Sequence, residues 1–304
     1  MSNIEENSYH KINLNWYPGH MAKTKRQILE DLKLIDVVIE ILDARIPMSS
    51  QNPDIREYTK NKKKIVVLNK SDLADEKQNA KWVNYFNTNK IPCLLVDSNT
   101  GKGVGEVIRQ IEKISLDTKK EYESKGRTGK IIRIMILGIP NVGKSSFINR
   151  ITKKTSATVG NKPGVTRQKQ WVQVKDNIQL LDTPGVLWPK FESEQIALNL
   201  AYTGTIKDDI LDKVEIAYNL IKYLLENYKT NLLERYKLDE KEVDNILSNE
   251  NQMENENILD VMHLIGKKRG AIVSGGNIDE QKVANIILDE FRSGKIGNIT
   301  IEKI

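Results

Sequence analysis

The chain has 304 residues, 39% of them hydrophobic and 29% charged, and a formal net charge of +6. This length suits two domains with cores of their own. The absence of an eighteen-residue apolar run argues against a membrane-spanning helix, and the acidic, polar start MSNIEENSYH argues against a secretion signal. We therefore expect a cytoplasmic protein without a membrane partner, and the positive charge favours polyanionic partners. The single cysteine, Cys93, excludes an internal disulfide and a multi-cysteine zinc site.

The first elements of the chain are a compact aromatic segment, a helix and a strand. Residues 13–24 read NLNWYPGHMAKT, and a helix is predicted from there to about residue 35. A strand over residues 36–42 ends at Asp43-Ala44-Arg45, and in the loop that follows Pro53 favours the start of a short helix.

The next predicted strand, 64–68, ends in a motif that can select guanine. Asn69-Lys70-Ser71-Asp72 matches N-K-x-D. The Asp72 carboxylate can accept hydrogen bonds from both N1–H and the exocyclic amine of guanine, a donor pair that adenine lacks. Asn69 would support the loop and meet the purine edge, while the Lys70 stem covers the ring. Such a site strongly rejects a base that leaves its polar groups unpaired. Taken alone, four residues also fit a solvated turn.

A second candidate base loop follows a helix at 76–86 and a strand at 91–96. It reads Asp97-Ser98-Asn99-Thr100-Gly101-Lys102-Gly103. In GTPases the equivalent loop often reads S-A-x-x-G-x-G, and a backbone N–H there contacts guanine O6. Asp97-Ser98 stands where Ser-Ala is usual, but a backbone contact requires no particular side chain, so Ser98 and Asn99 are expected at the base. A long charged helix is predicted over 104–125.

The strongest motif lies between a predicted strand at 131–137 and a helix that begins near Ser146. Gly138-Ile-Pro-Asn-Val-Gly-Lys-Ser145 matches the phosphate-loop pattern G-x-x-x-x-G-K-[ST] in its strand–loop–helix context. Its backbone N–H groups and the following helix N-terminus would hold phosphates. Lys144 would reach the β- and γ-phosphates, and the Ser145 hydroxyl would bind Mg²⁺. The expected lining residues are Asn141, Val142, Gly143, Lys144, Ser145 and Ser146.

Two further segments fit switches that respond to the γ-phosphate. The polar stretch before a predicted strand at 170–174 contains Thr166, whose hydroxyl would complete the Mg²⁺ shell. A strand at 178–181 ends in Asp182-Thr183-Pro184-Gly185, which matches D-x-x-G. Asp182 would bind Mg²⁺ through water, and the Gly185 N–H would sense the γ-phosphate.

Beyond these motifs the pattern is helical, and we place a domain boundary between residues 203 and 204. An apolar stripe with helical spacing covers 217–228, and further helices are predicted at 258–265 and 279–291. The region from 204 to 304 contains no catalytic motif. It is expected to bind RNA, with Lys267, Lys268 and Arg269 as candidates, although a solvated charged turn fits this triplet equally well.

The guanine motifs precede the phosphate loop, the reverse of the Ras-like order. Because a doubly wound sheet gathers its ligand loops at the carboxyl ends of its strands, the elements can be permuted around an intact site. We therefore expect an α/β fold: a circularly permuted Ras-like P-loop GTPase domain over 1–203 with a mostly parallel sheet, followed by a small all-α domain.

Four strings carry a resemblance to one family. WYPGHMAKT, DARIPMSSQNP, GIPNVGKSS and DTPGVLWPK make the chain similar to the circularly permuted ribosome biogenesis GTPase A (RbgA/YlqF) family. The resemblance implies a GTPase that binds GTP or GDP with Mg²⁺ and assists late maturation of the bacterial large (50S) ribosomal subunit. It also implies contact with rRNA and release on GTP hydrolysis. We expect a monomer and no DNA partner.

The group that positions the attacking water is left open. Ras-like enzymes use a Gln directly after D-x-x-G, where this chain has Val186. The candidates are His20, through the resemblance, and a K⁺ ion bound by Asn141, and the two are compatible. The catalytic set expected is His20, Thr166 and Gly185. An alternative function is a nucleotide-gated RNA-binding factor in which hydrolysis is incidental. A metabolic P-loop kinase fits less well, because the guanine motifs are nearly complete.

Overall fold

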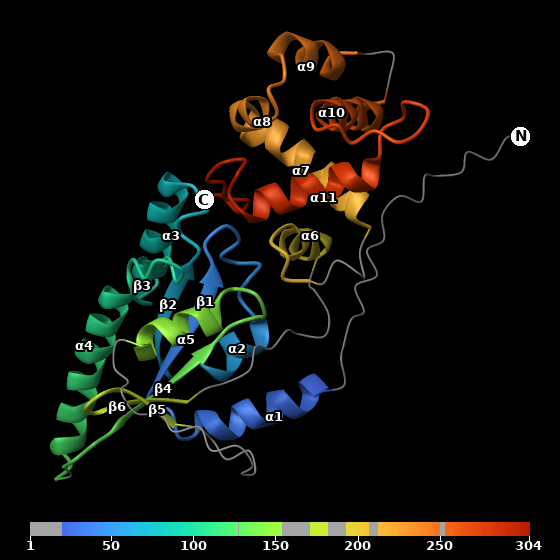
Figure 1. The fold of residues 1–304 in the computed structure, drawn as a ribbon. Coiled ribbons are helices and arrows are strands. Elements are labelled where there is room, and N and C mark those ends of the chain that lie inside the picture. The colour runs from blue at the N-terminus through green and yellow to red at the C-terminus, as the bar shows by residue number, and fades with distance from the viewer. Residues whose placement is uncertain (1–19, 127, 154–170, 182–192, 207–211, 250–252) are drawn as a thin grey trace, which may run out of the picture. The chain divides into compact units, whose positions relative to one another are not determined.

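The structure, a computed structural model, describes residues 20–126, 128–153, 171–181, 193–206, 212–249 and 253–304 (Figure 1). The side chains of residues 20–25, 153 and 254 lie outside this description. The described residues fall into two compact units. The sheet unit runs as far as Leu181 and also includes Glu302–Ile304, and the helical unit runs from Ser193 to Ile301.

The sheet unit is built on a six-stranded sheet with the order β3-β2-β1-β4-β6-β5. The strands are β1 (Val37–Asp43), β2 (Lys63–Asn69), β3 (Cys93–Val96), β4 (Ile132–Leu137), β5 (Trp171–Lys175) and β6 (Ile178–Leu181). Neighbouring strands are parallel except β5 and β6, which form an antiparallel hairpin at one edge. Every residue of β1 is buried, which is typical of a parallel strand covered on both faces.

Helices connect and cover these strands. They are α1 (His20–Leu32), α2 (Pro53–Tyr58), α3 (Glu76–Thr88), α4 (Val104–Glu123) and α5 (Lys144–Lys153). Ile28 and Leu32 of α1 pack in one buried cluster with Val38 of β1 and Met135 of β4. Trp82 and Phe86 of α3 form another with residues of β2 and β3. The apolar residues of α1 and α3 therefore lie on the faces that these two helices bury.

The topology brings the carboxyl ends of β3, β2, β1 and β4 to one edge of the sheet. Asp43 at the end of β1 is in register with Asn69 at the end of β2, and Asn69 is in register with Val96 of β3. The phosphate-loop strand β4 pairs with the other side of β1. The three loops that carry the predicted nucleotide-binding residues from Asn69 to Ser146 therefore start from the same edge, as does the loop after β1.

The helical unit consists of α6 (Glu194–Tyr202), α7 (Lys213–Asn227), α8 (Lys229–Tyr236), α9 (Glu240–Leu247), α10 (Glu254–Lys268) and α11 (Glu280–Arg292) in the part of the chain that the structure describes. Arg292 at the end of α11 donates hydrogen bonds to the backbone oxygens of Ala201 (2.8 Å) and Tyr202 (3.1 Å). These bonds satisfy carbonyls that the last turn of α6 leaves without helical partners. Among the described residues, no helix is long and apolar enough to cross a membrane.

The last three residues of the chain belong to the sheet unit. The Glu302 carboxylate accepts hydrogen bonds from the backbone N–H groups of Met48 (2.6 Å) and Ser49 (2.9 Å). The Trp82 indole N–H donates to the Glu302 backbone oxygen at 2.8 Å. The loop after β1 is therefore fixed by a segment more than 250 positions away in the sequence.

The predicted fold class is confirmed: the sheet is mostly parallel, the order of the strands is permuted, and a helical region follows. The predicted strands are present with shifts of one or two residues at their ends. The sequence did not resolve α6, α8 and α9 as separate helices. By its contacts α6 groups with the helical unit, and the boundary proposed at residue 203 stays a prediction.

Candidate nucleotide site

The phosphate loop joins β4 to α5, as its motif predicts. Lys144 begins α5, and its side chain is buried, with Nζ donating to the Ile139 backbone oxygen at 2.5 Å. Ser145 and Ser146 follow in the first turn and are exposed. The loop thus presents hydroxyl groups to solvent at a helix N-terminus, where the helix dipole favours phosphate.

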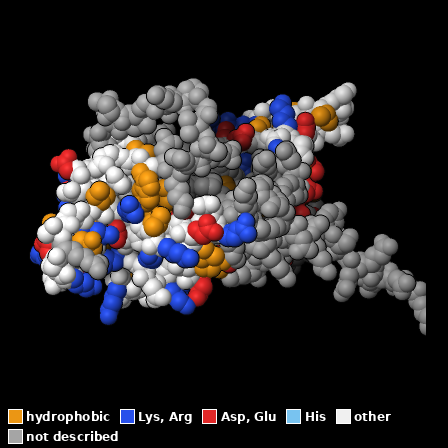
Figure 2. Space-filling model, turned by 90° about the horizontal axis from the view of Figure 1, so that it is seen from below, with side chains coloured by type: hydrophobic (Ala, Val, Ile, Leu, Met, Phe, Trp, Pro, Cys, Tyr) orange, Lys and Arg blue, Asp and Glu red, His pale blue; other side chains and the backbone are white. Residues whose placement is uncertain are grey.

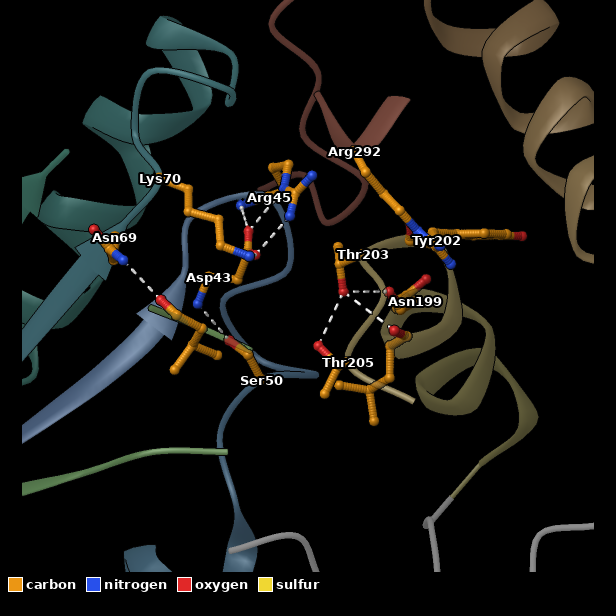
Figure 3. Close-up of polar contacts among 12 residues, drawn as sticks. Asp43, Arg45, Ser50, Asn69, Lys70, Asn199, Tyr202, Thr203, Thr205 and Arg292 are labelled. Atoms are coloured by element: carbon orange, nitrogen blue, oxygen red, sulfur yellow. Dashed lines mark hydrogen bonds and ion pairs between the residues drawn. The ribbon is translucent and has the colours of Figure 1, made fainter. Parts of the chain in front are cut away.

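Asn69 connects this loop to the base-recognition side of the site. Its Nδ2 donates to the Val142 backbone oxygen at 2.7 Å, and its Oδ1 accepts from the Ser98 backbone N–H (3.1 Å) and hydroxyl (2.7 Å). Figure 3 marks the first of these bonds as a dashed line from the Asn69 side-chain nitrogen. One buried amide therefore joins the N-K-x-D loop, the phosphate loop and the second base loop.

Gly143 is required at its position by this contact. Its φ is +92°, a conformation that side chains other than glycine rarely adopt. A Cβ atom there would lie 2.2 Å from Asn69 Nδ2. The second glycine of the phosphate motif therefore makes room for the Asn69 amide as well as for the turn.

Arg150 of α5 provides a second link between the two sides. Its guanidinium donates to the backbone oxygens of Ser98, at 3.2 Å from Nε, and Asn99. The second base loop is thus bound by the helix that follows the phosphate loop. Its own shape is set by Asp97, whose carboxylate accepts from the backbone N–H groups of Asn99 and Thr100.

Lys70 is held by a buried carboxylate at the end of β1 (Figure 3). Asp43 Oδ2 lies 3.0 Å from Lys70 Nζ, and both carboxylate oxygens bind the Arg45 guanidinium, at 2.9 Å and 2.7 Å. Burial by itself would raise the pKa of Asp43, but Arg45 and Lys70 outweigh it and hold that pKa below its usual range. The charged Asp43 fixes the ammonium end of the Lys70 side chain predicted to cover the base.

Asp72 is exposed, as a residue that binds a ligand base should be before the ligand arrives. Partial burial raises the pKa of its carboxyl, and the nearby negative charge of Asp97 raises it further. Hydrogen bonds from guanine N1–H and the exocyclic amine would stabilise the ionised form that the site requires.

Several predicted residues lie outside the described residues. These are Thr166, Asp182 and Gly185. The backbone of His20 is the first residue of α1, but its side chain is not described. Asn141 is exposed and has a left-handed φ of 62° within the phosphate loop. The assigned roles of all five stay predictions.

Sequence reasoning missed three charged residues that shape this site: Asp43, Arg45 and Arg150. Asp43 and Arg45 stood at the end of a predicted strand, the position where the other site residues occur, so the signal was present. Arg150 gave no signal, because a single arginine on an amphipathic helix is common.

The three residues of the basic triplet in the helical unit differ in their environment. Lys267 and Lys268 are exposed in the last turn of α10. Arg269 lies over the Tyr236 ring and is paired with Glu290 at 3.2 Å. Arg269 therefore has a role in packing, and RNA contact from this turn would fall to the two lysines.

The phosphate loop, N-K-x-D loop and second base loop, joined at one edge of a permuted parallel sheet, define a P-loop GTPase. The profile of a family described as "50S ribosome-binding GTPase" matches residues 133–262. Ribosome biogenesis GTPase A of Bacillus licheniformis is 42% identical over 95% of this chain and 98% of its own length. The protein of the same name from Bacillus cereus is 42% identical over 95% of this chain and 93% of its own length.

Solved structures agree on the fold. GNP-bound YlqF from Thermotoga maritima has a TM-score of 0.63 at 23% identity, covering 92% of this chain and 98% of that chain. The GDP-bound form has a TM-score of 0.65 at 22% identity, covering 91% and 99%. The chain belongs to the ribosome biogenesis GTPase A family: it is a GTPase that binds guanine nucleotides and has a role in ribosome biogenesis.

The Asn69 contacts predict a graded loss of nucleotide affinity. Asn69→Ala removes both the amide donor to Val142 and the amide acceptor for Ser98, and it leaves the Val142 oxygen without its donor. GDP affinity should therefore fall about 10- to 100-fold. Asn69→Asp keeps an acceptor for Ser98 but cannot donate to Val142, and its loss should be at least as large because two oxygens then face each other. Fluorescent GDP titration measures both. Asn84→Ala, an exposed site on α3, is the control. Wild-type affinity in Asn69→Ala would show that the link is dispensable.

Lys144 predicts a pH dependence of nucleotide binding. Burial lowers its pKa to about 8, and anionic phosphates beside Nζ would raise it again. Binding should therefore take up a proton above pH 8, so the logarithm of GDP affinity should fall with a slope of up to about one per pH unit from about pH 8 to 9, below the pH at which guanine N1–H itself ionises. Lys144→Arg, which stays charged throughout, should remove the slope. An unchanged slope in that variant would assign the titration to another group.

Proposed function

We propose that this GTPase acts in late maturation of the bacterial large (50S) ribosomal subunit: it docks in the GTP-bound state and is released when GTP is hydrolysed. The observation that carries the guanine-nucleotide part is the Asn69 amide, which holds the base loop and the phosphate loop in one site. The ribosomal part is supported by relatives at 42% identity named ribosome biogenesis GTPase A.

The described residues have separate tasks in this proposal. Asp72 selects guanine through its exposed carboxylate, and the Asp43-anchored Lys70 lies along the base. The Lys144 ammonium would exchange its contact with the Ile139 oxygen for the β- and γ-phosphates, gaining a charged acceptor. The exposed N-terminal turn of α5 binds the phosphate oxygens.

The donor set fits Mg²⁺, which prefers hard oxygen ligands. The Ser145 hydroxyl is exposed at the start of α5, and we propose that Thr166 and Asp182 complete the set. Mg²⁺ neutralises charge on the β- and γ-phosphates when it is bound. A K⁺ ion at Asn141 would suit the same oxygen-rich environment.

Hydrolysis needs a group that positions water, and Val186 offers no hydrogen-bonding atom. We assign this task to His20, assisted by K⁺ at Asn141, with Thr166 and the Gly185 N–H sensing the γ-phosphate. Slow intrinsic turnover follows, because His20 would act on the nucleotide only in the complex with the ribosomal particle.

The proposed partner is the precursor of the large subunit, through its rRNA. Lys267 and Lys268, exposed at the end of α10, are candidate phosphate contacts of the helical unit. We propose that the protein acts as a monomer without a DNA partner.

The test is GTP turnover measured alone, with mature large subunits and with immature ones. We expect stimulation of at least about tenfold by large subunits, and His20→Ala should remove most of it, in line with the 10²–10⁴-fold typical of a positioned acid–base group. GTP affinity should stay unchanged in that variant. Replacing KCl by NaCl should slow hydrolysis.

Each outcome has a distinct meaning. No stimulation by either particle would contradict the proposal and favour the RNA-binding factor in which hydrolysis is incidental. Stimulation that survives His20→Ala would remove His20 as the water-positioning group. Equal rates of hydrolysis in KCl and NaCl would show that K⁺ has no part in the reaction.

A further inference from the structure

An open groove of about 490 Å³ lies in the sheet unit, away from the nucleotide site. It is lined by residues of the loop after β1, of α2 and the turn that follows it, of the start of β2, and of the end of α3 and the residues that follow it. Lys63 and Lys64 open β2, whereas Asn69 closes it, and at the rise of a β-strand this is a separation of roughly 16–20 Å. The groove volume falls in the range of roughly 300–1,000 Å³ seen for ligand pockets.

The lining of the groove is strongly basic. None of the described residues that line it is acidic, and the cations are Arg56, Lys60, Lys62, Lys63, Lys64 and Lys90. Three lysines have carboxylate partners from outside the lining: Lys60 with Glu57, Lys63 with Glu121 and Lys64 with the buried Glu40.

The other three cations form no ion pair among the described residues. Lys62 Nζ donates to the Ile35 backbone oxygen at 2.8 Å, and Arg56 and Lys90 are exposed. The lining therefore keeps an excess of three positive charges after its ion pairs are counted. Figure 2, a view from below, shows Lys and Arg side chains beside patches of hydrophobic ones on the described surface.

The lining of the groove also contains an exposed aromatic ring. Tyr85 is 40% exposed and lines the groove. Its ring meets Trp82 and Phe86 edge to face, each at 5.4 Å between centroids, so the neighbours fix its orientation. A basic groove with a fixed, partly exposed aromatic ring is the arrangement that binds single-stranded nucleic acid, because phosphates follow the cations and a base stacks on the ring.

We propose that this groove is a second RNA site, which binds a single-stranded rRNA segment with its phosphates at Arg56 and Lys90 and one base on Tyr85. The inference rests on the proposed ribosomal function and adds a contact in the sheet unit. An acidic protein segment would satisfy the charges alone, but it would gain nothing from an exposed flat ring.

The test is binding of a fluorescein-labelled single-stranded 12-mer RNA to the full chain, followed by anisotropy at several salt concentrations. Arg56→Gln/Lys90→Gln should weaken binding and reduce the slope of log K against log salt by about 1.4, the value for two lost phosphate contacts on a single strand. Tyr85→Ala should weaken binding at least about fivefold, and Tyr85→Phe should restore it.

Lys113→Gln/Lys120→Gln is the matched control, because it removes the same charge from exposed positions of α4 outside the groove. Thermal melting and basal GTP turnover verify that each variant is folded. Equal losses in the groove and control pairs would overturn the proposal in favour of unspecific charge attraction. Wild-type RNA affinity in the Arg56→Gln/Lys90→Gln variant would also overturn it. If polyglutamate competed as strongly as unlabelled RNA, the groove would be assigned to an acidic protein partner instead.

The proposal and the ribosomal function fail separately. Subunit-stimulated turnover in the wild type with no effect of the groove pair on RNA binding would reject only the groove. RNA binding at the groove without any subunit effect on turnover would reject only the ribosomal function.

Discussion

The site depends on one side-chain amide. Asn69 donates to the phosphate loop at the Val142 oxygen and accepts from the second base loop at Ser98, while its own backbone begins the N-K-x-D loop. A residue with only donors or only acceptors could not make this set of contacts. Because the amide is buried, each lost partner would leave a polar atom without water, and the three loops therefore keep their spacing.

The parallel sheet explains why permutation leaves this arrangement intact. β1 lies between β2 and β4, so the guanine-reading strand and the phosphate-loop strand are separated by one strand whatever their order in the chain. That middle strand contributes Asp43, which anchors Lys70 and Arg45. The buried charge is stable there because Arg45 and Lys70 both pair with it, and only the loss of both cations would leave an uncompensated carboxylate.

Much of this could be predicted from local sequence. Apolar runs followed by Gly-rich or N-K-x-D motifs identify strand ends, and a parallel sheet gathers those ends at one edge. Asn69 was recognised through its motif, but its contacts with Val142 and Ser98 join residues 73 and 29 positions away, which no local pattern specifies. Arg150 and the groove cations were missed for the same reason. Arg269 was taken as a candidate nucleic-acid contact because its ion pair with Glu290, 21 positions away, cannot be seen in the local sequence.

The most direct measurement of the central claim, that base loop and phosphate loop form one pocket, is the nucleotide preference of Asp72→Asn. Its amide can donate to the C2 oxygen of xanthine, so affinity should move from GTP to xanthosine triphosphate by about a hundredfold or more, given the discrimination that buried hydrogen-bonding sites achieve. Adding Lys144→Ala to this variant should then abolish binding of xanthosine triphosphate. Unchanged GTP affinity in Asp72→Asn, or xanthosine triphosphate binding that is indifferent to Lys144, would contradict a shared pocket.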